Sequence, residues 1–216
     1  MNSYLKQMIT GGEGQELDFK FEISDSKKIA RTLSAFANTR GGTLLVGVKD
    51  NGKIAGIRSD EEYYMLEAAA KLYCKPEVSF SVRQWQADGK TVLEARIEKS
   101  TAPPHYARSE DGKWLAYIRV KDENILANSI MIRVWKRKNN PKGTLVRYSE
   151  KEKILFDYLK ENETITLSMF QRIARINVQT AGTILVNLIV LDLVGITFRE
   201  KRIVYTLAGK NHRVST

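Results

Sequence analysis

The stretch from Gly12 to Gly56 decides the fold, and it reads GEGQELDFKFEISDSKKIARTLSAFANTRGGTLLVGVKDNGKIAG. Its first part alternates Leu17, Phe19 and Phe21 with charged residues, the period-two pattern of a half-buried strand. Apolar residues then recur at helical spacing behind a cluster of N-capping side chains, and two glycines end that helix. A compact apolar run predicts a central strand, and Asp-Asn-Gly predicts a hairpin turn. The block therefore predicts strand, helix, strand, turn and strand.

Charged residues of this block lie where a site could form. Four of them share the face of the first strand opposite its aromatic residues, and two more lie just before that strand and just after the next. These residues are Glu16, Asp18, Lys20 and Glu22, then Glu13 and Asp50. A solvated strand face and a turn explain the same residues, so spacing alone leaves both readings open.

Several segments, in the same order, resemble the AlbA-like domain of Schlafen-related proteins. They are Leu-Asp-Phe-Lys, Ser-Ala-Phe-Ala-Asn-Thr-Arg-Gly-Gly, Leu-Val-Gly-Val-Lys-Asp-Asn-Gly, Pro-Pro-His-Tyr-Ala and Tyr-Ile-Arg-Val-Lys-Asp-Glu-Asn. The resemblance runs from about Glu13 to Trp135 and implies an α+β domain, a mixed sheet with flanking helices. Bacterial members of that family are commonly described as transcriptional regulators or divergent ATP-binding proteins.

Some Schlafen proteins cleave RNA with metal ions, and the resemblance places their acidic residues at Glu13, Asp18 and Asp50. Hard oxygen ligands would hold Mg²⁺ or Mn²⁺, which activates water and stabilises the phosphoryl transition state. Asp18 stands where a glutamate is usual, and the Cys/His cluster and second lobe of the larger Schlafens are absent from the sequence. A metal-dependent ribonuclease is therefore the alternative function, and Mg²⁺ or Mn²⁺ is a cofactor only under that alternative.

Length and composition describe an ordinary soluble globular protein. The chain has 216 residues, 43% hydrophobic and 28% charged, enough for one large and one small domain. No apolar run approaches the ~18 residues of a membrane span, so we expect a cytoplasmic protein with no membrane partner. The single cysteine, Cys74, excludes an internal disulfide and a cysteine-cluster metal site.

Charge is distributed unevenly along the chain. Residues 1–128 hold 19 Lys/Arg against 18 Asp/Glu, whereas residues 129–216 hold 16 against 7. A nearly neutral front part and a basic back part suggest that the back part meets a polyanion.

The middle of the chain predicts a helix over 59–74, strands over 78–86 and 91–98 around a second hairpin, and another strand over 114–120. Residues 122–138 predict a helix that buries Ile125, Ile130 and Trp135.

His105, alone in a loop with two prolines, is interpreted as a hydrogen-bonding residue. Gly47 to Lys53 imitates a P-loop, but Ile54 stands where a hydroxyl is needed, so we interpret it as a hairpin.

A run of cations without an intervening acid surrounds the turn composition Asn-Asn-Pro-Lys-Gly, which predicts a domain boundary. The expected parts are an AlbA-like domain over 1–138, a basic linker over 139–148 and a small domain over 149–216. The cations, candidates for phosphate contacts, are Arg133, Lys136, Arg137, Lys138, Lys142 and Arg147.

The last part predicts three helices and a hairpin, in an order that resembles a winged helix-turn-helix. In that family the third helix enters the major groove and the hairpin, or wing, contacts the backbone. The helix offers Asn177, Gln179, Thr180 and Thr183 as contacts, and the hairpin tip offers Arg199, Lys201 and Arg202. Val186 and Val190 are expected on the outer face of this helix, where they would suit a protein partner.

The sequence therefore predicts a nucleic-acid-binding protein, a DNA-binding transcriptional regulator with DNA favoured over RNA, acting as a homodimer. Besides the ribonuclease, an ATP-binding or dimerisation module remains an alternative.

Overall fold

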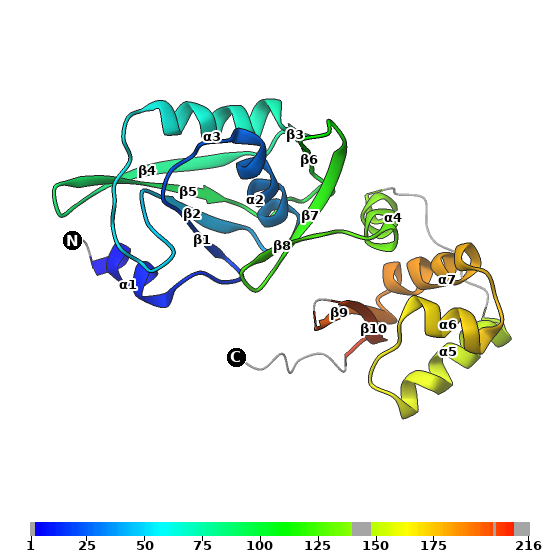
Figure 1. The fold of residues 1–216 in the computed structure, drawn as a ribbon. Coiled ribbons are helices and arrows are strands. Elements are labelled where there is room, and N and C mark those ends of the chain that lie inside the picture. Colours follow the sequence, from blue (N-terminus) through cyan, green and yellow to red (C-terminus); the bar gives the residue numbers. More distant parts are fainter. Residues whose placement is uncertain (1–2, 140–147, 201, 210–216) are drawn as a thin grey trace. The chain divides into compact units, whose positions relative to one another are not determined.

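The computed structural model describes residues 3–139, 148–200 and 202–209 of the chain. The chain divides into two compact units, Met1–Ala127 and Asn128–Thr216 (Figure 1).

The first unit is an α+β domain with two four-stranded sheets and three helices. One sheet has the order β1-β2-β5-β4, in which β1 and β2 are parallel and the remaining pairs are antiparallel. The other sheet has the order β3-β6-β7-β8 and is antiparallel. The mixed sheet with flanking helices agrees with the fold class expected from the sequence. The strands are β1 (Leu17–Lys20), β2 (Gly42–Val46), β3 (Cys74–Lys75), β4 (Phe80–Ala87), β5 (Lys90–Ile97), β6 (Tyr106–Arg108), β7 (Trp114–Val120) and β8 (Glu123–Leu126); the helices are α1 (Ser3–Gly11), α2 (Ser26–Asn38) and α3 (Glu61–Leu72).

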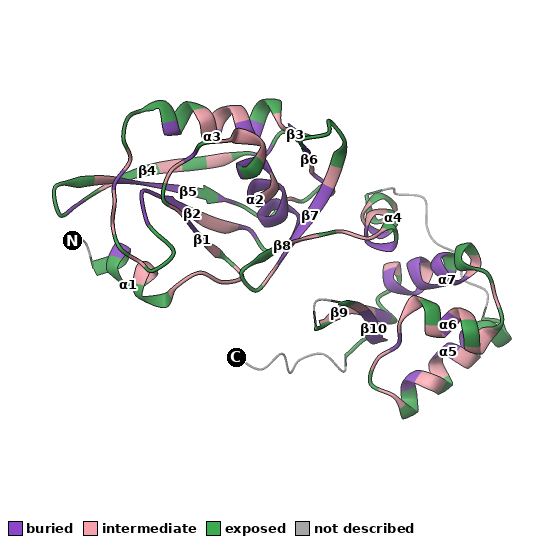
Figure 2. Ribbon diagram, in the orientation of Figure 1, coloured by how far each residue is buried: buried purple, intermediate pink, exposed green. Residues whose placement is uncertain are grey.

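Helix α2 forms the centre of the first unit. The Asp25 side chain caps it by accepting a hydrogen bond from the backbone nitrogen of Lys27 at 2.8 Å. Its apolar residues Leu33 and Phe36 are fully buried, and the helix packs against β7 and α3 (Figure 2). This burial, rather than helix propensity, holds α2 in place.

Polar side chains at the end of α2 tie the loop before β6 to the core. Asn38 donates to the carbonyl oxygens of His105 (2.8 Å) and Tyr117 (2.9 Å), and its Oδ1 accepts from the His105 backbone nitrogen at 2.7 Å. The His105 ring is bonded at both nitrogens, to the Pro76 carbonyl oxygen and to Ser100 Oγ. The interpretation of His105 as a hydrogen-bonding residue is confirmed.

Cys74 is expected not to react with a thiol reagent while the protein is folded. Burial raises the pKa of its thiol to about 12, so almost no thiolate exists near neutral pH. Titration with a chromogenic disulfide reagent should detect one thiol only after denaturant is added. Rapid reaction of the native protein would show that this part of the core opens readily.

Within its described residues, the second unit contains four helices and a two-stranded hairpin. They are α4 (Ser129–Lys138), α5 (Glu150–Glu161), α6 (Leu167–Ala174), α7 (Val178–Val190), β9 (Val194–Arg199) and β10 (Arg202–Leu207). Side chains of Ser149, Thr166 and Asn177 cap the last three helices, as their sequence positions suggest. Ile165 forms an isolated bridge with Tyr205 of β10, which ties the loop before α6 to the hairpin.

The expectation of one helix over 122–138 is wrong in its first half. Residues 123–126 form β8, because Lys121 adopts a left-handed backbone with φ 57° and turns the chain back onto β7. The helix begins only at Ser129, where the side chain of Asn128 caps it.

Helix α4 packs with the second unit, whereas the expected boundary after residue 138 would leave it in the first. Its Ile130 and Val134 are buried in the second unit's core. Residues 140–147 of the expected linker, which include Lys142 and Arg147, lie outside the described residues.

The turn after β2 agrees with the hairpin interpretation of the P-loop-like segment. Val48 and Ile54 form an antiparallel bridge, and Lys49 donates its backbone N–H to the Lys53 carbonyl oxygen at 3.0 Å. Helix α1, in contrast, was not foreseen from the sequence.

Among the described helices, none is by itself long and apolar enough to cross a membrane; α6 and α7 reach the required length and composition only as a bent pair.

Candidate nucleic-acid interface

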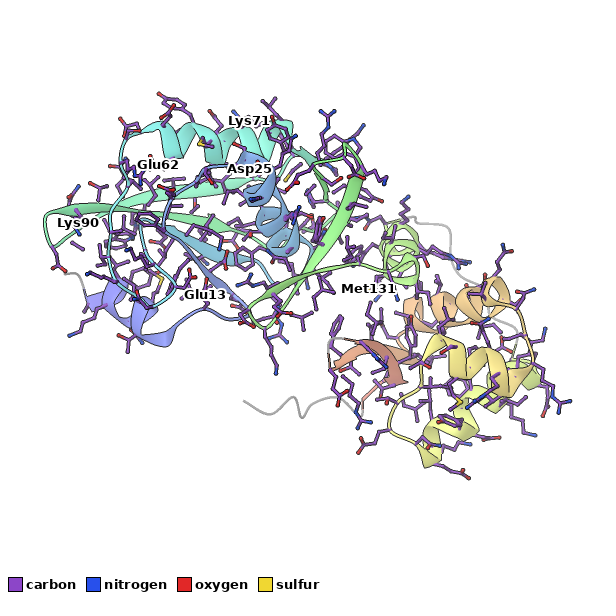
Figure 3. All side chains as sticks on the ribbon, in the orientation of Figure 1. Glu13, Asp25, Glu62, Lys71, Lys90 and Met131 are labelled. Atoms are coloured by element: carbon purple, nitrogen blue, oxygen red, sulfur yellow. The ribbon has the colours of Figure 1, made fainter. Side chains whose placement is uncertain are left out.

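Two of the three acidic residues implied by the Schlafen resemblance lie close together in the first unit. Glu13 precedes β1, and its Oε1 accepts a hydrogen bond from the backbone nitrogen of Phe19 at 2.8 Å (Figure 3). Burial raises the pKa of the Glu13 carboxyl, and the neighbouring Asp18 carboxylate acts in the same direction. Glu13 therefore accepts a proton more readily than an exposed glutamate.

Asp18 is buried, contrary to the expectation of an exposed charged strand face. It is only 4% exposed because Arg119 of β7 lies against it, with Nη2 at 3.0 Å from Asp18 Oδ1. Lys20 Nζ lies 2.8 Å from the other carboxylate oxygen. Arg119 also donates to backbone carbonyl oxygens of Gly14 and Leu17, so the ion pair holds β1 against the second sheet.

The acidic residues as placed do not fit a three-carboxylate metal site. Asp18 faces two cations, and Asp50 is exposed in the turn after β2. In the part of the chain that the structure describes, no three His, Cys, Asp or Glu side chains come together as possible metal ligands.

An exposed aromatic site lies beside the carboxyl ends of β1 and β2, and the sequence did not suggest it. Phe21 follows the last residue of β1 and is 39% exposed, whereas its alternation with Leu17 and Phe19 predicted a buried side chain. Lys49 Nζ and the Arg58 guanidinium lie 5.1 Å and 5.7 Å from the ring centroid. The exposed ring can stack on a base, and the two cations beside it can pair with a phosphate.

In the second unit, α6 and α7 are inclined at 112° and joined by the three residues 175–177. Arg175 makes the turn possible by adopting a left-handed backbone, with φ 52° and ψ 47°. This angle and turn length are those of helix-turn-helix motifs. Gln179 and Thr183 of α7 are exposed, as is Val178, so the start of α7 presents two polar side chains and one apolar side chain to solvent.

Asn177 and Thr180 contribute less to this surface than the sequence implied. Asn177 Oδ1 accepts a hydrogen bond from the Thr180 backbone nitrogen at 2.8 Å, so the side chain serves as the helix cap. Its Nδ2 remains as a donor for an outside group. Thr180 itself is only partly exposed.

Helix α4 covers one side of α7, which corrects the expectation that Val186 lies on an outer face. Val186 is 1% exposed because it lies in the apolar core that Ile130 and Val134 of α4 help to form. Arg133 of α4 reaches across α7, and its Nη2 donates to Thr183 Oγ1 at 2.8 Å. Helix α7 has no cation of its own, and this contact places one beside its polar side chains.

Gly182 allows Arg133 to lie against α7. A Cβ atom at this position would stand 3.1 Å from Arg133 Nη1, the flexible end of a side chain. Replacing Gly182 with alanine should displace the guanidinium and leave the fold at least as stable, because alanine in a helix interior is favoured by about 1 kcal/mol. Urea denaturation tests this expectation. A variant less stable than the native protein would mean that Arg133 cannot move aside.

The proposed cations differ in how freely they can meet a phosphate. Lys138 Nζ lies 2.9 Å from Asp192 Oδ1, and Arg199 Nη2 lies 2.9 Å from Glu163 Oε2. Both pairs are exposed and weak. Among the described side chains no carboxylate stands within ion-pair distance of four candidates, Arg133, Lys136, Arg137 and Arg202. Lys142 and Lys201 lie outside the described residues.

Comparisons with solved structures give two similarities at low identity. One is to the DIP2311 protein from Corynebacterium diphtheriae, with 21% identity and a TM-score of 0.45 over 62% of this chain and 26% of that one. The chain thus spans about a quarter of that protein. The other is to the N-terminal domain of an ATP-dependent DNA helicase RecG-related protein from Nitrosomonas europaea, with 19% identity, a TM-score of 0.41 and coverage of 68% and 95%.

The comparison with curated proteins gives no match. The family model described as Schlafen, AlbA_2 matches residues 13–128, which is more than half of the chain. These residues include β1 to β8 with α2 and α3, the part that resembled this family in the sequence. The chain belongs to the Schlafen AlbA_2 family.

Proposed function

We propose that the protein binds nucleic acid through its second unit, as a DNA-binding transcriptional regulator of the cytoplasm. In this proposal, residues 149–209 form a winged helix-turn-helix. Their order supports it: a helix, a bridge at Ile165, two helices at 112°, and a hairpin. Family membership supports a nucleic-acid-related role for the first unit as well.

The observation that carries the proposal is the position of Arg133 beside the start of α7. Helix-turn-helix proteins read base edges with the N-terminal residues of their second helix. In this chain the exposed residues at the start of α7 are uncharged, the polar Gln179 and Thr183 beside the apolar Val178, and the cation comes from α4 through the 2.8 Å contact with Thr183. Arginine is the side chain that most often reads guanine, through two hydrogen bonds to O6 and N7. Arg133 with Gln179 and Thr183 thus forms a surface able to contact bases and phosphates.

Duplex DNA, single-stranded DNA and structured RNA of equal length, each titrated at two salt concentrations, test the proposal. We expect duplex DNA to bind tightest and its affinity to fall steeply with salt, because phosphate contacts release counterions. Arg133→Gln, which keeps a polar side chain but removes the charge, should weaken binding. Equal or tighter binding of structured RNA would assign the surface to RNA instead.

The ribonuclease alternative is tested in the same samples by adding Mn²⁺ to the structured RNA. Asp18 is a poor reporter, because its replacement would disturb the ion pair with Arg119. Glu13→Gln and Asp50→Asn are suitable variants, since Asp50 is exposed in a turn. If the native chain cleaves the RNA and neither variant does, these residues form a metal-dependent site only when RNA is bound.

A further inference from the structure

Strand β4 forms one edge of the first sheet and is paired only on one side. It pairs with β5 from Phe80 to Ala87, and no other described strand lies along its outer edge. The two-residue turn Asp88-Gly89 has positive φ at both positions, the type I′ geometry in which Ala87 and Lys90 form a hydrogen-bonded pair. Because such pairs alternate, every second residue from Phe80 directs its backbone N–H and C=O outward: Phe80, Val82, Gln84 and Gln86.

This edge lacks the usual protection against pairing. The strand has eight residues, no proline and an unbroken register with β5, and Arg83 is its one charged residue. Natural edge strands are commonly short, bulged or interrupted by proline or several charges. The outward groups of β4 therefore form a template for another extended strand.

A groove of about 500 Å³ runs between this edge and α3. Figure 1 shows α3 alongside β4 and running in the opposite direction, and Figure 3 labels Lys71 on the helix. Ala70, Val78, Phe80 and Val82 give the groove an apolar floor, and Tyr63 borders it with 36% of its surface exposed. A groove between a helix and an edge strand is the architecture that receives an added strand.

The charges at this surface favour a second copy of the same chain. Lys71 Nζ lies 2.7 Å from Glu67 Oε1, so these two side chains of α3 together add no net charge to the groove. Antiparallel pairing of β4 with itself, centred on Gln84, would place Arg83 opposite Trp85 of the second copy. Within one chain the Arg83 guanidinium already lies 5.2 Å from the Trp85 ring centroid. A register centred on Arg83 would instead oppose two arginines.

We infer that the outer edge of β4, with the neighbouring face of α3, is the surface through which two copies of this chain form a symmetric dimer. The β1-β2-β5-β4 sheets of the two copies then form one continuous sheet across a two-fold axis near Gln84. This surface lies wholly in the first unit and does not depend on nucleic-acid binding by the second.

Cysteine cross-linking of the full-length protein tests the register. Two Gln84→Cys side chains would lie opposite each other at about 5.5 Å between Cα atoms, within the range of a disulfide. The matched control is Gln86→Cys, equally exposed, whose copies would be roughly 14 Å apart and beyond that range. The native Cys74 does not interfere, because it is buried. We expect mild oxidation to link most of the Gln84→Cys protein and little of the Gln86→Cys protein.

Solution mass gives the second test. The native chain should show about twice its 24.6 kDa mass by light scattering. Gln84→Pro removes an outward N–H that β5 does not use and should give the monomer mass, whereas Gln84→Ala keeps that N–H and should remain dimeric. Should the proline variant fail to fold, Val82→Lys places a charge in the groove and should also give the monomer mass. A monomeric native protein, or equal cross-linking of both cysteine variants, would overturn the inference.

Discussion

Replacing Arg119 with methionine is expected to destabilise the first unit by about 3–5 kcal/mol, because Asp18 loses its buried partner and keeps only the partly exposed Lys20. Asp18 is almost inaccessible to water, and Arg119 is 2% exposed. The variant also leaves the carbonyl oxygens of Gly14 and Leu17 without this donor. Urea denaturation followed by circular dichroism measures the change in free energy of unfolding.

The matched control is Arg58→Met, which removes an exposed arginine from its pair with Glu22 at 2.9 Å. We expect less than about 1 kcal/mol for that variant, because exposed ion pairs contribute little. Combining Arg119→Met with Asp18→Leu should restore part of the lost stability, since no charge is then buried alone. A double variant as unstable as the sum of the two single variants would show that the pair is not coupled.

The second large effect concerns binding, and it follows from the cations that lie on or beside α4. Replacing Arg133, Lys136 and Arg137 with alanine should weaken duplex DNA binding on the order of 100-fold, if each phosphate contact contributes about 1 kcal/mol. The slope of log affinity against log salt should also become shallower by about 2–3, since each lost contact removes about 0.9. Fluorescence anisotropy at several salt concentrations gives both quantities.

A variant with the same change in charge provides the control for this effect. Lys28, Lys75 and Lys99 are exposed lysines of the first unit, and their replacement by alanine also removes three positive charges. If net charge alone attracts DNA, the two triple variants will bind equally weakly. If α4 belongs to the interface, the control variant should keep nearly the native salt slope.

Much of the fold could be predicted from the sequence, because local signals and burial agree there. The caps Asp25, Ser149, Thr166 and Asn177 begin their helices as their positions suggest. The prediction of one helix over 122–138 failed because the left-handed turn at Lys121 is not visible in a pattern of apolar residues. Tertiary pairing with β7 decided the structure of this segment.

The site was harder to predict, since it depends on contacts between distant parts of the chain. Asp18 occupies a charged alternation typical of an exposed face, and only the second sheet, 101 residues later, supplies the arginine that buries it. Likewise, nothing near Val186 in the sequence indicates that α4 will cover it. The cations of α4 were recognised as a cluster, but their place beside α7 required the fold.

Amide hydrogen exchange of the full-length protein, with and without a duplex that it binds, tests the central claim most directly. The claim is that α4 and the start of α7 together form the nucleic-acid interface. We predict that DNA slows exchange in residues 133–138 and 178–183 and leaves β4 and α3 unchanged. Protection confined to the first unit, with no change at α4 and α7, would contradict the account.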